Sequence, residues 1–207
     1  MNSLTKELIT QEVTEAATAA GVTIKLAYSE QEESPRKFFE VSSKLVTGDR
    51  GRLSNMADIK MPRDLCGDSL KRNIANYSRA AGVPKSDMLV WSVYTHEHGK
   101  IALSISPYSC SFDGQCSGFI YESRKELYAE FGVKRITKAI QDKIEERIRA
   151  ELNELEQWAN GEIAELIIEK DGEEVMWRSS IYSPNVTDVT EMALELIHEY
   201  KTEQLAA

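Results

Sequence analysis

The sequence predicts an α+β fold, in which an antiparallel sheet of about six strands packs one face against a long amphipathic helix, with N- and C-terminal helices flanking it. Two observations favour this class. Short segments rich in β-branched residues occur as hairpin pairs, and an apolar residue recurs every three or four positions from about 137 to 160. A chain of 207 residues fits one domain, 1–207, which we expect to include a long irregular segment at 30–68.

The N-terminal part begins with a predicted helix and a predicted strand. Residues 3–20 place apolar side chains at helical spacing, with Ser3 as a candidate cap and Gly21 as the residue that ends the helix. Residues 22–29 alternate and contain several β-branched side chains, which indicates a strand. Beyond the irregular segment, a short helix is expected at 69–82.

The middle of the chain predicts a hairpin, a return strand and a capped helix. Strands at 88–95 and 100–106 are separated by His-Glu-His-Gly, which we interpret as the hairpin turn, with Gly99 near its tip. A short strand follows at 118–122. Residues 123–132 begin with a Ser-x-x-Glu capping box and end in glycine, as a short helix does.

The long helix is the strongest prediction, because its apolar stripe is continuous. Asp171-Gly172 then separates two further strands, 162–169 and 174–182, and this dipeptide is a strong hairpin signal. A last helix is expected to begin at Asn185 or Thr187. The stripe of the long helix consists of Ile136, Ile140, Ile144, Ile148, Leu152, Leu155 and Ala159.

Charge is distributed unevenly along the chain. Residues 1–121 hold 14 basic and 14 acidic residues, whereas residues 122–207 hold 11 basic and 20 acidic ones, which accounts for the whole net charge of −9. Such a surface repels nucleic-acid phosphate and would suit a basic protein partner, or it could imitate nucleic acid. The alternative is a solvated acidic helix face that keeps the protein soluble.

The N-terminus lacks the basic start and apolar centre of a signal peptide, and no segment is apolar enough to span a membrane. An odd number of cysteines, three, fits a reducing compartment. We therefore expect a cytoplasmic protein without a membrane partner.

Several short motifs occur in a fixed order along the chain. They are Ser-Pro-Arg, Ser-Pro-aromatic-Ser-Cys, aromatic-Asp, Gly-Phe-Ile-Tyr and Gly-Val-Lys-Arg, in residues 32–43, 91–110, 113–121 and 130–138. Together they resemble the pattern of a family of small proteins of bacteriophages and other mobile elements. The matching positions are Ser34, Pro35, Arg36, His98, Ser106, Pro107, Ser109, Cys110, Asp113, Gly118, Phe119 and Tyr121.

The resemblance implies an accessory gene of a phage, and such genes often act against host defences. It implies no established enzyme activity. The chain departs from the family pattern after Ser-Pro-Arg, where Lys37-Phe38-Phe39 replaces the usual Trp-Asp-Asn-Leu-Gly, and Cys116 has no counterpart in the pattern. The function of the Ser-Pro-Arg loop in this chain can therefore differ from its function in the family.

The cysteines and histidines allow two kinds of chemistry. Cys110 and Cys116 could bind a soft metal together with His96 and His98, since alternate strand residues share a face. Cys110 and His98 could instead act as nucleophile and base, with Asp113 as an orienting acid. Against both stands the usual state of a free cysteine, which is a small buried hydrophobe. We predict no metal and no cofactor.

The Ser-Pro-Arg segment is expected to form a fixed turn, because Pro35 restricts both its own backbone and that of Ser34. We expect Arg36 to pair with Asp113 and pin the long loop to the sheet. In the alternative, this loop grips a partner.

A modest basic cluster beside Tyr77 is a weak candidate for contact with nucleic acid, because the net charge opposes it. Its members are Lys71, Arg72, Arg79 and Lys85.

These observations lead to one functional hypothesis and two alternatives. The hypothesis is a non-enzymatic accessory protein that binds and blocks a host protein through an acidic surface, with a nucleic-acid-handling defence complex as the expected partner class. The alternatives are a small enzyme that uses Cys110 and His98, and a homo-oligomer, such as a homodimer, that associates through the apolar stripe of the last helix. The predicted binding residues are Glu145, Glu146, Glu154, Glu156, Asp171, Glu173, Ser34 and Arg36.

Overall fold

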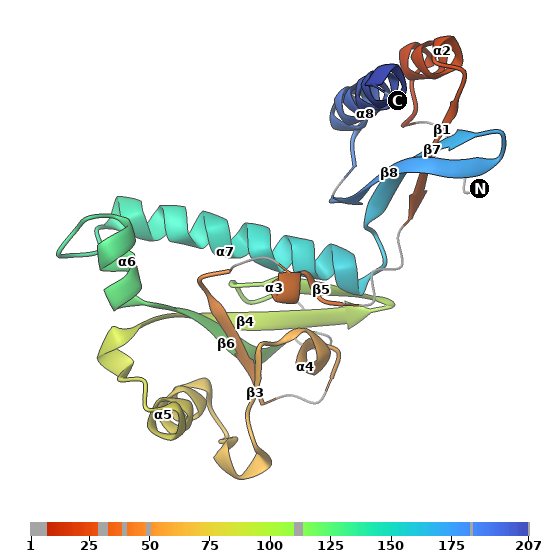
Figure 1. Ribbon diagram of the computed structural model, residues 1–207. Coiled ribbons are helices and arrows are strands. Elements are labelled where there is room, and N and C mark those ends of the chain that lie inside the picture. Colours follow the sequence, from red (N-terminus) through yellow and green to blue (C-terminus); the bar gives the residue numbers. More distant parts are fainter. Residues whose placement is uncertain are drawn as a thin grey trace. The chain divides into compact units, whose positions relative to one another are not determined.

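The chain divides into two compact units with separate sheets. The computed structural model describes residues 8–28, 33–38, 41–48, 51–109, 114–182 and 184–206. One unit, here the terminal unit, is built from residues 1–32 and 161–207, and the other, the central unit, from residues 33–160 (Figure 1). The α+β class is confirmed, but the prediction of one sheet of about six strands is wrong. The structure has sheets of three and five strands, because the first strand and the last hairpin pair with each other.

The described part of the terminal unit contains two helices and a three-stranded antiparallel sheet in the order β1-β7-β8. Its elements are α2 (Gln11–Ala19), β1 (Thr23–Tyr28), β7 (Ala164–Lys170), β8 (Glu173–Ile181) and α8 (Val186–Ala206).

Local sequence accounts for the ends of these elements. Thr10 caps α2 by accepting a hydrogen bond from the Val13 N–H at 3.4 Å, whereas Ser3, the predicted cap, lies outside the described residues. Asp171 and Gly172 both have positive φ, 54° and 87°, which the tight two-residue turn between β7 and β8 requires. The hairpin predicted from Asp-Gly is therefore confirmed.

One face of the terminal sheet holds the core of this unit. Helices α2 and α8 lie side by side over that face (Figure 1) and pack on alternate residues of the strands. The apolar stripe of α8 is buried here, so it is used inside the unit and is not free to serve as the oligomer interface considered above. The buried residues of α8 are Val189, Ala193, Leu196, Ile197 and Tyr200.

The central unit contains a five-stranded sheet in the order β3-β2-β6-β4-β5. Every neighbouring pair is antiparallel except β2 and β3, which are parallel. The strands are β2 (Lys44–Thr47), β3 (Ile59–Lys60), β4 (Met88–His98), β5 (Lys100–Ser104) and β6 (Gly114–Ser123).

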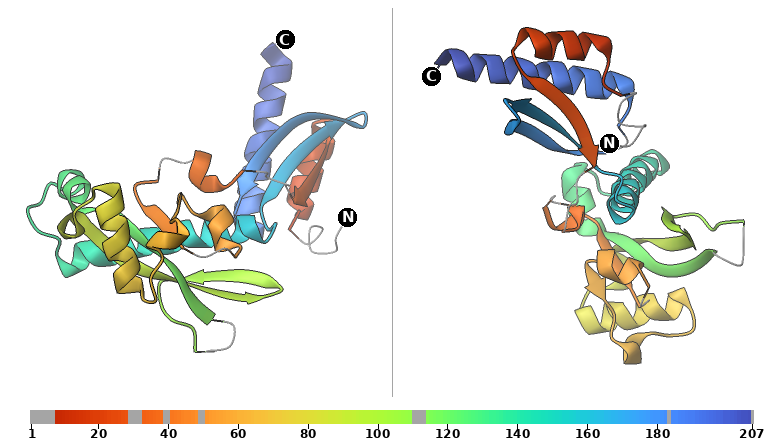
Figure 2. Two further views of the ribbon diagram at one scale, coloured as in Figure 1. Left: turned by 90° about the horizontal axis from the view of Figure 1, so that it is seen from below. Right: turned by 90° about the vertical axis from the view of Figure 1, so that its right-hand side faces the viewer.

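Helices cover both faces of this sheet. The long helix lies on one face and α5 (Leu70–Ala81) on the other (Figure 2, right). The long helix packs through its predicted stripe, and Tyr77 of α5 meets Phe119 and Tyr121. Caps from Ser69, Ser123 and Thr137 begin the three longer helices. The helices are α3 (Pro35–Phe38), α4 (Leu53–Met56), α5 (Leu70–Ala81), α6 (Arg124–Glu130) and α7 (Lys138–Ala159), with single 3₁₀ turns η1 (Arg63–Leu65) and η2 (Lys85–Asp87).

Residues 30–68 are less irregular than the sequence indicates, in so far as they are described. They contribute α3, β2, α4, β3 and η1, each of two to four residues. Strand β2 lies inside the sheet, between β3 and β6, and its residues Leu45 and Val46 are fully buried on opposite faces. Elements this short do not produce a detectable period, which is why they were not predicted.

The central hairpin is tighter than predicted. His96, Glu97 and His98 belong to β4 and pair with β5, so the turn is formed by Gly99 alone, with φ 78°. Strand β6 begins at Gly114, four residues before the predicted start. In the described part of the chain, no helix has both the length and the apolar character that crossing a bilayer requires.

Candidate functional site

The Ser-Pro-Arg segment forms a buried ion cluster in the central unit. Arg36, whose side chain is 3% exposed, donates to Asp58 at 2.8 Å and to Glu151 at 3.1 Å. It also donates to the carbonyl and hydroxyl oxygens of Ser43, and the Ser43 hydroxyl donates to Glu151. These contacts fasten α3 to β2, β3 and α7, as a structural role requires. Asp113, the predicted partner of Arg36, lies outside the described residues.

A second ion cluster lies one turn earlier on α7. Arg147 bridges Glu122 on β6, at 2.6 Å, and Glu130 on α6, at 2.7 Å. The Glu122 side chain is 2% exposed, and this burial raises its pKa despite the guanidinium of Arg147. The two clusters are neighbours, since Glu151 also raises the pKa of Glu122.

The four predicted acidic binding residues on α7 do not form one patch. Glu145 accepts from the indole N–H of Trp91 at 3.1 Å, and Glu156 accepts from the Leu103 N–H at 2.8 Å, so both serve the fold. Glu146 is exposed. Glu154 is nine residues after Glu145, which is about two and a half helical turns, so the two carboxylates lie on opposite sides of α7.

Environment moves the pKa of two of these acids in opposite directions. The hydrogen bond from Trp91 lowers the pKa of Glu145, whereas burial raises the pKa of Glu154. Of the four, Glu146 is therefore the residue whose carboxylate is most available to a partner.

Ser34 and Arg36 are buried, which leaves them little surface for a partner. The remaining predicted residues, Asp171 and Glu173, belong to the terminal unit, where they flank the tip of the β7–β8 hairpin and are exposed. The structure therefore separates the eight predicted binding residues between two units.

The terminal sheet has an open face, which we define as the face opposite α2 and α8. Met176 packs toward the core and Arg178 pairs with Glu195 and Glu199 on α8, so Trp177, between them, points to the opposite face. Trp177 is 63% exposed and Val175 43%. Aromatic residues are enriched at protein interfaces, so an exposed tryptophan beside a second exposed apolar side chain makes this face a candidate binding surface.

Charged residues surround Trp177 on the open face. Lys25 pairs with Glu169 and, at 3.7 Å, with Glu174. Glu165 joins them, because alternation along β7 puts it on the same face as Ile167 and Glu169. An apolar centre within a charged rim is the usual anatomy of a protein interface.

Trp177 is not among the binding residues predicted from the sequence. The alternation of side chains along β8 does indicate that Trp177 and its neighbour Met176, which faces the core, point to opposite faces of the sheet. That signal could not be used without knowing which face of the hairpin the helices cover.

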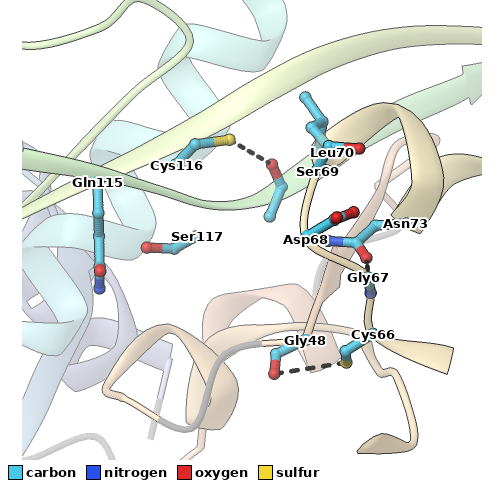
Figure 3. A pocket seen from close by; sticks show the side chains of 11 residues that line it. Gly48, Cys66, Gly67, Asp68, Ser69, Leu70, Asn73, Gln115, Cys116 and Ser117 are labelled. Carbon is cyan, nitrogen blue, oxygen red and sulfur yellow. Dashed lines mark hydrogen bonds between the residues drawn. The ribbon is translucent and has the colours of Figure 1, made fainter. Parts of the chain in front are cut away.

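A cavity of about 350 Å³ lies between the N-terminus of α5 and strand β6 in the central unit (Figure 3). Cys66 and Cys116 both line it. The Cys116 thiol donates to the Gly118 carbonyl at 3.8 Å, and Asn73 accepts from the Gly67 N–H at 2.6 Å. Cys116 is exposed as a residue, but partial burial of its thiol raises the pKa of that thiol, which weakens it as a nucleophile.

Cys110, the residue common to the metal and nucleophile hypotheses, lies outside the described residues. His96 packs against Tyr108, with ring centres 5.4 Å apart, and His98 is exposed at the hairpin tip. Within the described ranges, no three His, Cys, Asp or Glu side chains gather as a metal site requires.

Tyr77, next to the basic residues of α5, is buried and shares a hydrogen bond of 2.9 Å with Tyr121. Its ring is therefore not accessible for stacking on a base.

Comparisons of the chain with protein-family models, curated proteins and solved structures find no match.

Proposed function

We propose that the chain is an accessory protein of a phage or mobile element that binds a host protein through an acidic surface and blocks it. The resemblance of the Ser-Pro-Arg and Gly-Phe-Ile-Tyr segments to phage proteins suggests the setting. A nucleic-acid-handling defence complex, such as a CRISPR effector or a restriction enzyme, is the partner class that fits both the setting and the charge.

The observation that supports protein binding most directly is the open face of the terminal sheet. It presents Trp177 and Val175 to solvent beside Lys25, Glu169 and Glu174. Tryptophan is among the residues that contribute most to interface energies, and charged rims speed association with oppositely charged partners. Blocking then follows from occupation of basic side chains that would otherwise contact phosphate.

A two-step experiment tests this function. A tagged chain is used to capture proteins from host lysate, and the purified partner is then assayed for nucleic-acid binding with and without the chain. We expect the chain to compete with nucleic acid, and its association rate to fall as salt is raised.

Charge reversal at the hairpin tip, Asp171→Lys with Glu173→Lys, should slow association several-fold. Glu203→Lys, which alters an exposed residue of α8, is the control and should have a smaller effect. A captured protein whose nucleic-acid binding is unaffected by the chain would refute the blocking function.

A further inference from the structure

We propose that the open face of the terminal sheet is an arginine-binding site, in which the Trp177 indole stacks on a guanidinium that the Glu165 carboxylate also pairs. The occupant is a basic, arginine-containing segment of the partner protein. This inference rests on the proposed function, because it names the chemistry by which that partner is recognised.

The strand register places the two groups on one face. Trp177 on β8 lies opposite Ile167 on β7, and Lys25 on β1 lies opposite Ile167 from the other side. Glu165 and Glu169 are two residues before and after Ile167, so they share its face. Both therefore flank Ile167, the residue opposite Trp177, and the β7–β8 register shifts next to each of them.

The two carboxylates differ in availability. Glu169 is paired with Lys25, which also reaches Glu174. No described residue forms an ion pair with Glu165, whose side chain is partly exposed. A ligand cation above Trp177 therefore meets one carboxylate that is not already paired, while Lys25 is held by Glu169 and Glu174.

Arginine fits this arrangement better than lysine does. A guanidinium is planar, stacks on an indole and can donate two parallel hydrogen bonds to a carboxylate. A lysine ammonium is more strongly hydrated and is bound as a point charge. The exposed indole thus adds selectivity to an attraction that charge alone would give to either residue.

Charge also disfavours a second copy of this chain as the occupant. On this face Glu165, Glu169 and Glu174 outnumber Lys25, so two open faces brought together would repel each other. A basic segment gains from the same field.

The test uses the full chain and two end-blocked peptides of equal length, one alternating arginine with serine and the other lysine with serine. Binding is followed by calorimetry and by the indole N–H signal of Trp177, which is assigned with Trp177→Phe. We expect the arginine peptide to bind about tenfold more tightly, as a stacking contribution of this kind allows.

Two variants and two matched controls locate the site. Trp177→Ala should weaken binding of the arginine peptide about tenfold and remove the preference over lysine, and Glu165→Gln should weaken it several-fold. Leu205→Ala removes another exposed apolar side chain of the same unit, and Glu191→Gln another exposed acid; both should bind as the original chain does. Because Trp177 is exposed, Trp177→Ala should fold, which circular dichroism checks.

Equal affinity for the two peptides, or affinity unchanged by Trp177→Ala, would overturn the inference. A Trp177 signal that shifts with protein concentration alone would indicate a second copy and also overturn it. These outcomes are separate from the capture experiment: a host partner that binds Trp177→Ala normally removes the arginine site but leaves the proposed function, whereas a chain without any partner removes the function itself.

Discussion

At the residue scale, two side chains lie where their type is uncommon: a charged one is buried and a large apolar one is exposed. Arg36 is buried with Asp58 and Glu151 in the central unit, and Trp177 is exposed on the terminal one. The buried arginine has satisfied donors and holds several elements together. The exposed tryptophan has no such role in its own unit, which is why it is the better candidate for binding.

Replacing Arg36 tests the structural role of the Ser-Pro-Arg segment. Arg36→Met keeps the volume but leaves Asp58 and Glu151 without their cation, and we expect a loss of about 3 kcal/mol in the free energy of unfolding. Urea titration measures this loss. Lys37→Ala, at the exposed neighbour, should change stability by less than about 0.5 kcal/mol. Equal effects of the two changes would contradict the structural role.

Glu122 gives the chain a pH dependence whose sign follows from its raised pKa. The native state retains the proton at a pH where the unfolded chain, with a value near 4.5, has released it. The contribution of this carboxyl to stability is therefore fully present below pH 4.5 and decreases as the pH rises toward the raised value.

Comparing the original chain with Glu122→Gln between pH 4 and 7 measures that contribution. As pH rises, the free energy of unfolding of the original chain should fall relative to that of Glu122→Gln. Glu146→Gln, at an exposed position of α7, should show the same pH dependence of stability as the original chain. A difference that favours the original chain more strongly at pH 7 would show that Glu122 ionises more easily in the folded state.

At the element scale, the two sheets protect their edge strands in different ways. Strand β5, an edge of the central sheet, is closed by side chains from the end of α7. Asn160 both donates to and accepts from the Ile101 backbone at 2.9 Å, and Glu156 accepts from Leu103. Such cover prevents edge-to-edge pairing. In the terminal sheet, β8 is an edge strand, and the register shifts near both of its ends make regular pairing with another strand harder.

Removing the Asn160 amide should uncover the β5 edge. Asn160→Ala breaks two hydrogen bonds, and we expect a loss of about 1–2 kcal/mol together with faster aggregation on storage. Chemical unfolding and light scattering are the measurements. Asn153→Ala, at an exposed position of the same helix, is the control, and an Asn160→Ala chain indistinguishable from it would show that the edge does not depend on this side chain.

Most long elements could be predicted from the sequence, because periodicity and caps are local. The stripe of α7, the capping box at Ser123 and the Asp171-Gly172 turn are examples. The two-sheet arrangement could not be predicted in this way. It depends on Thr23 pairing with Glu169 across 146 residues, and nothing in either segment specifies its partner. The predicted acidic residues do not form one site for a related reason. Glu145 and Glu156 accept hydrogen bonds from Trp91 and Leu103 on neighbouring strands, and the helical pattern of the sequence does not indicate these partners.

At the scale of the whole molecule, the central unit is an insertion in the sequence of the terminal unit, whose two parts precede and follow it. Both apolar cores of the central unit consist only of residues from 33–160, and the core of the terminal unit draws on both chain ends. We therefore expect residues 33–160 to fold when expressed alone, with slow amide exchange in β4 and β6 as in the full chain. Rapid exchange throughout that fragment would mean that the central unit depends on the terminal one.

The most direct measurement of the central claim is site-specific crosslinking in host lysate. A photoreactive amino acid replaces Val175, which is 43% exposed beside Trp177, in one chain and Leu205, the 90% exposed control, in another. We expect position 175 to crosslink to a protein with a basic surface, added arginine-rich peptide to suppress the product, and position 205 not to form it. Absence of a product at position 175, or the same product at both positions, would contradict the claim that the open face is where this protein binds its partner.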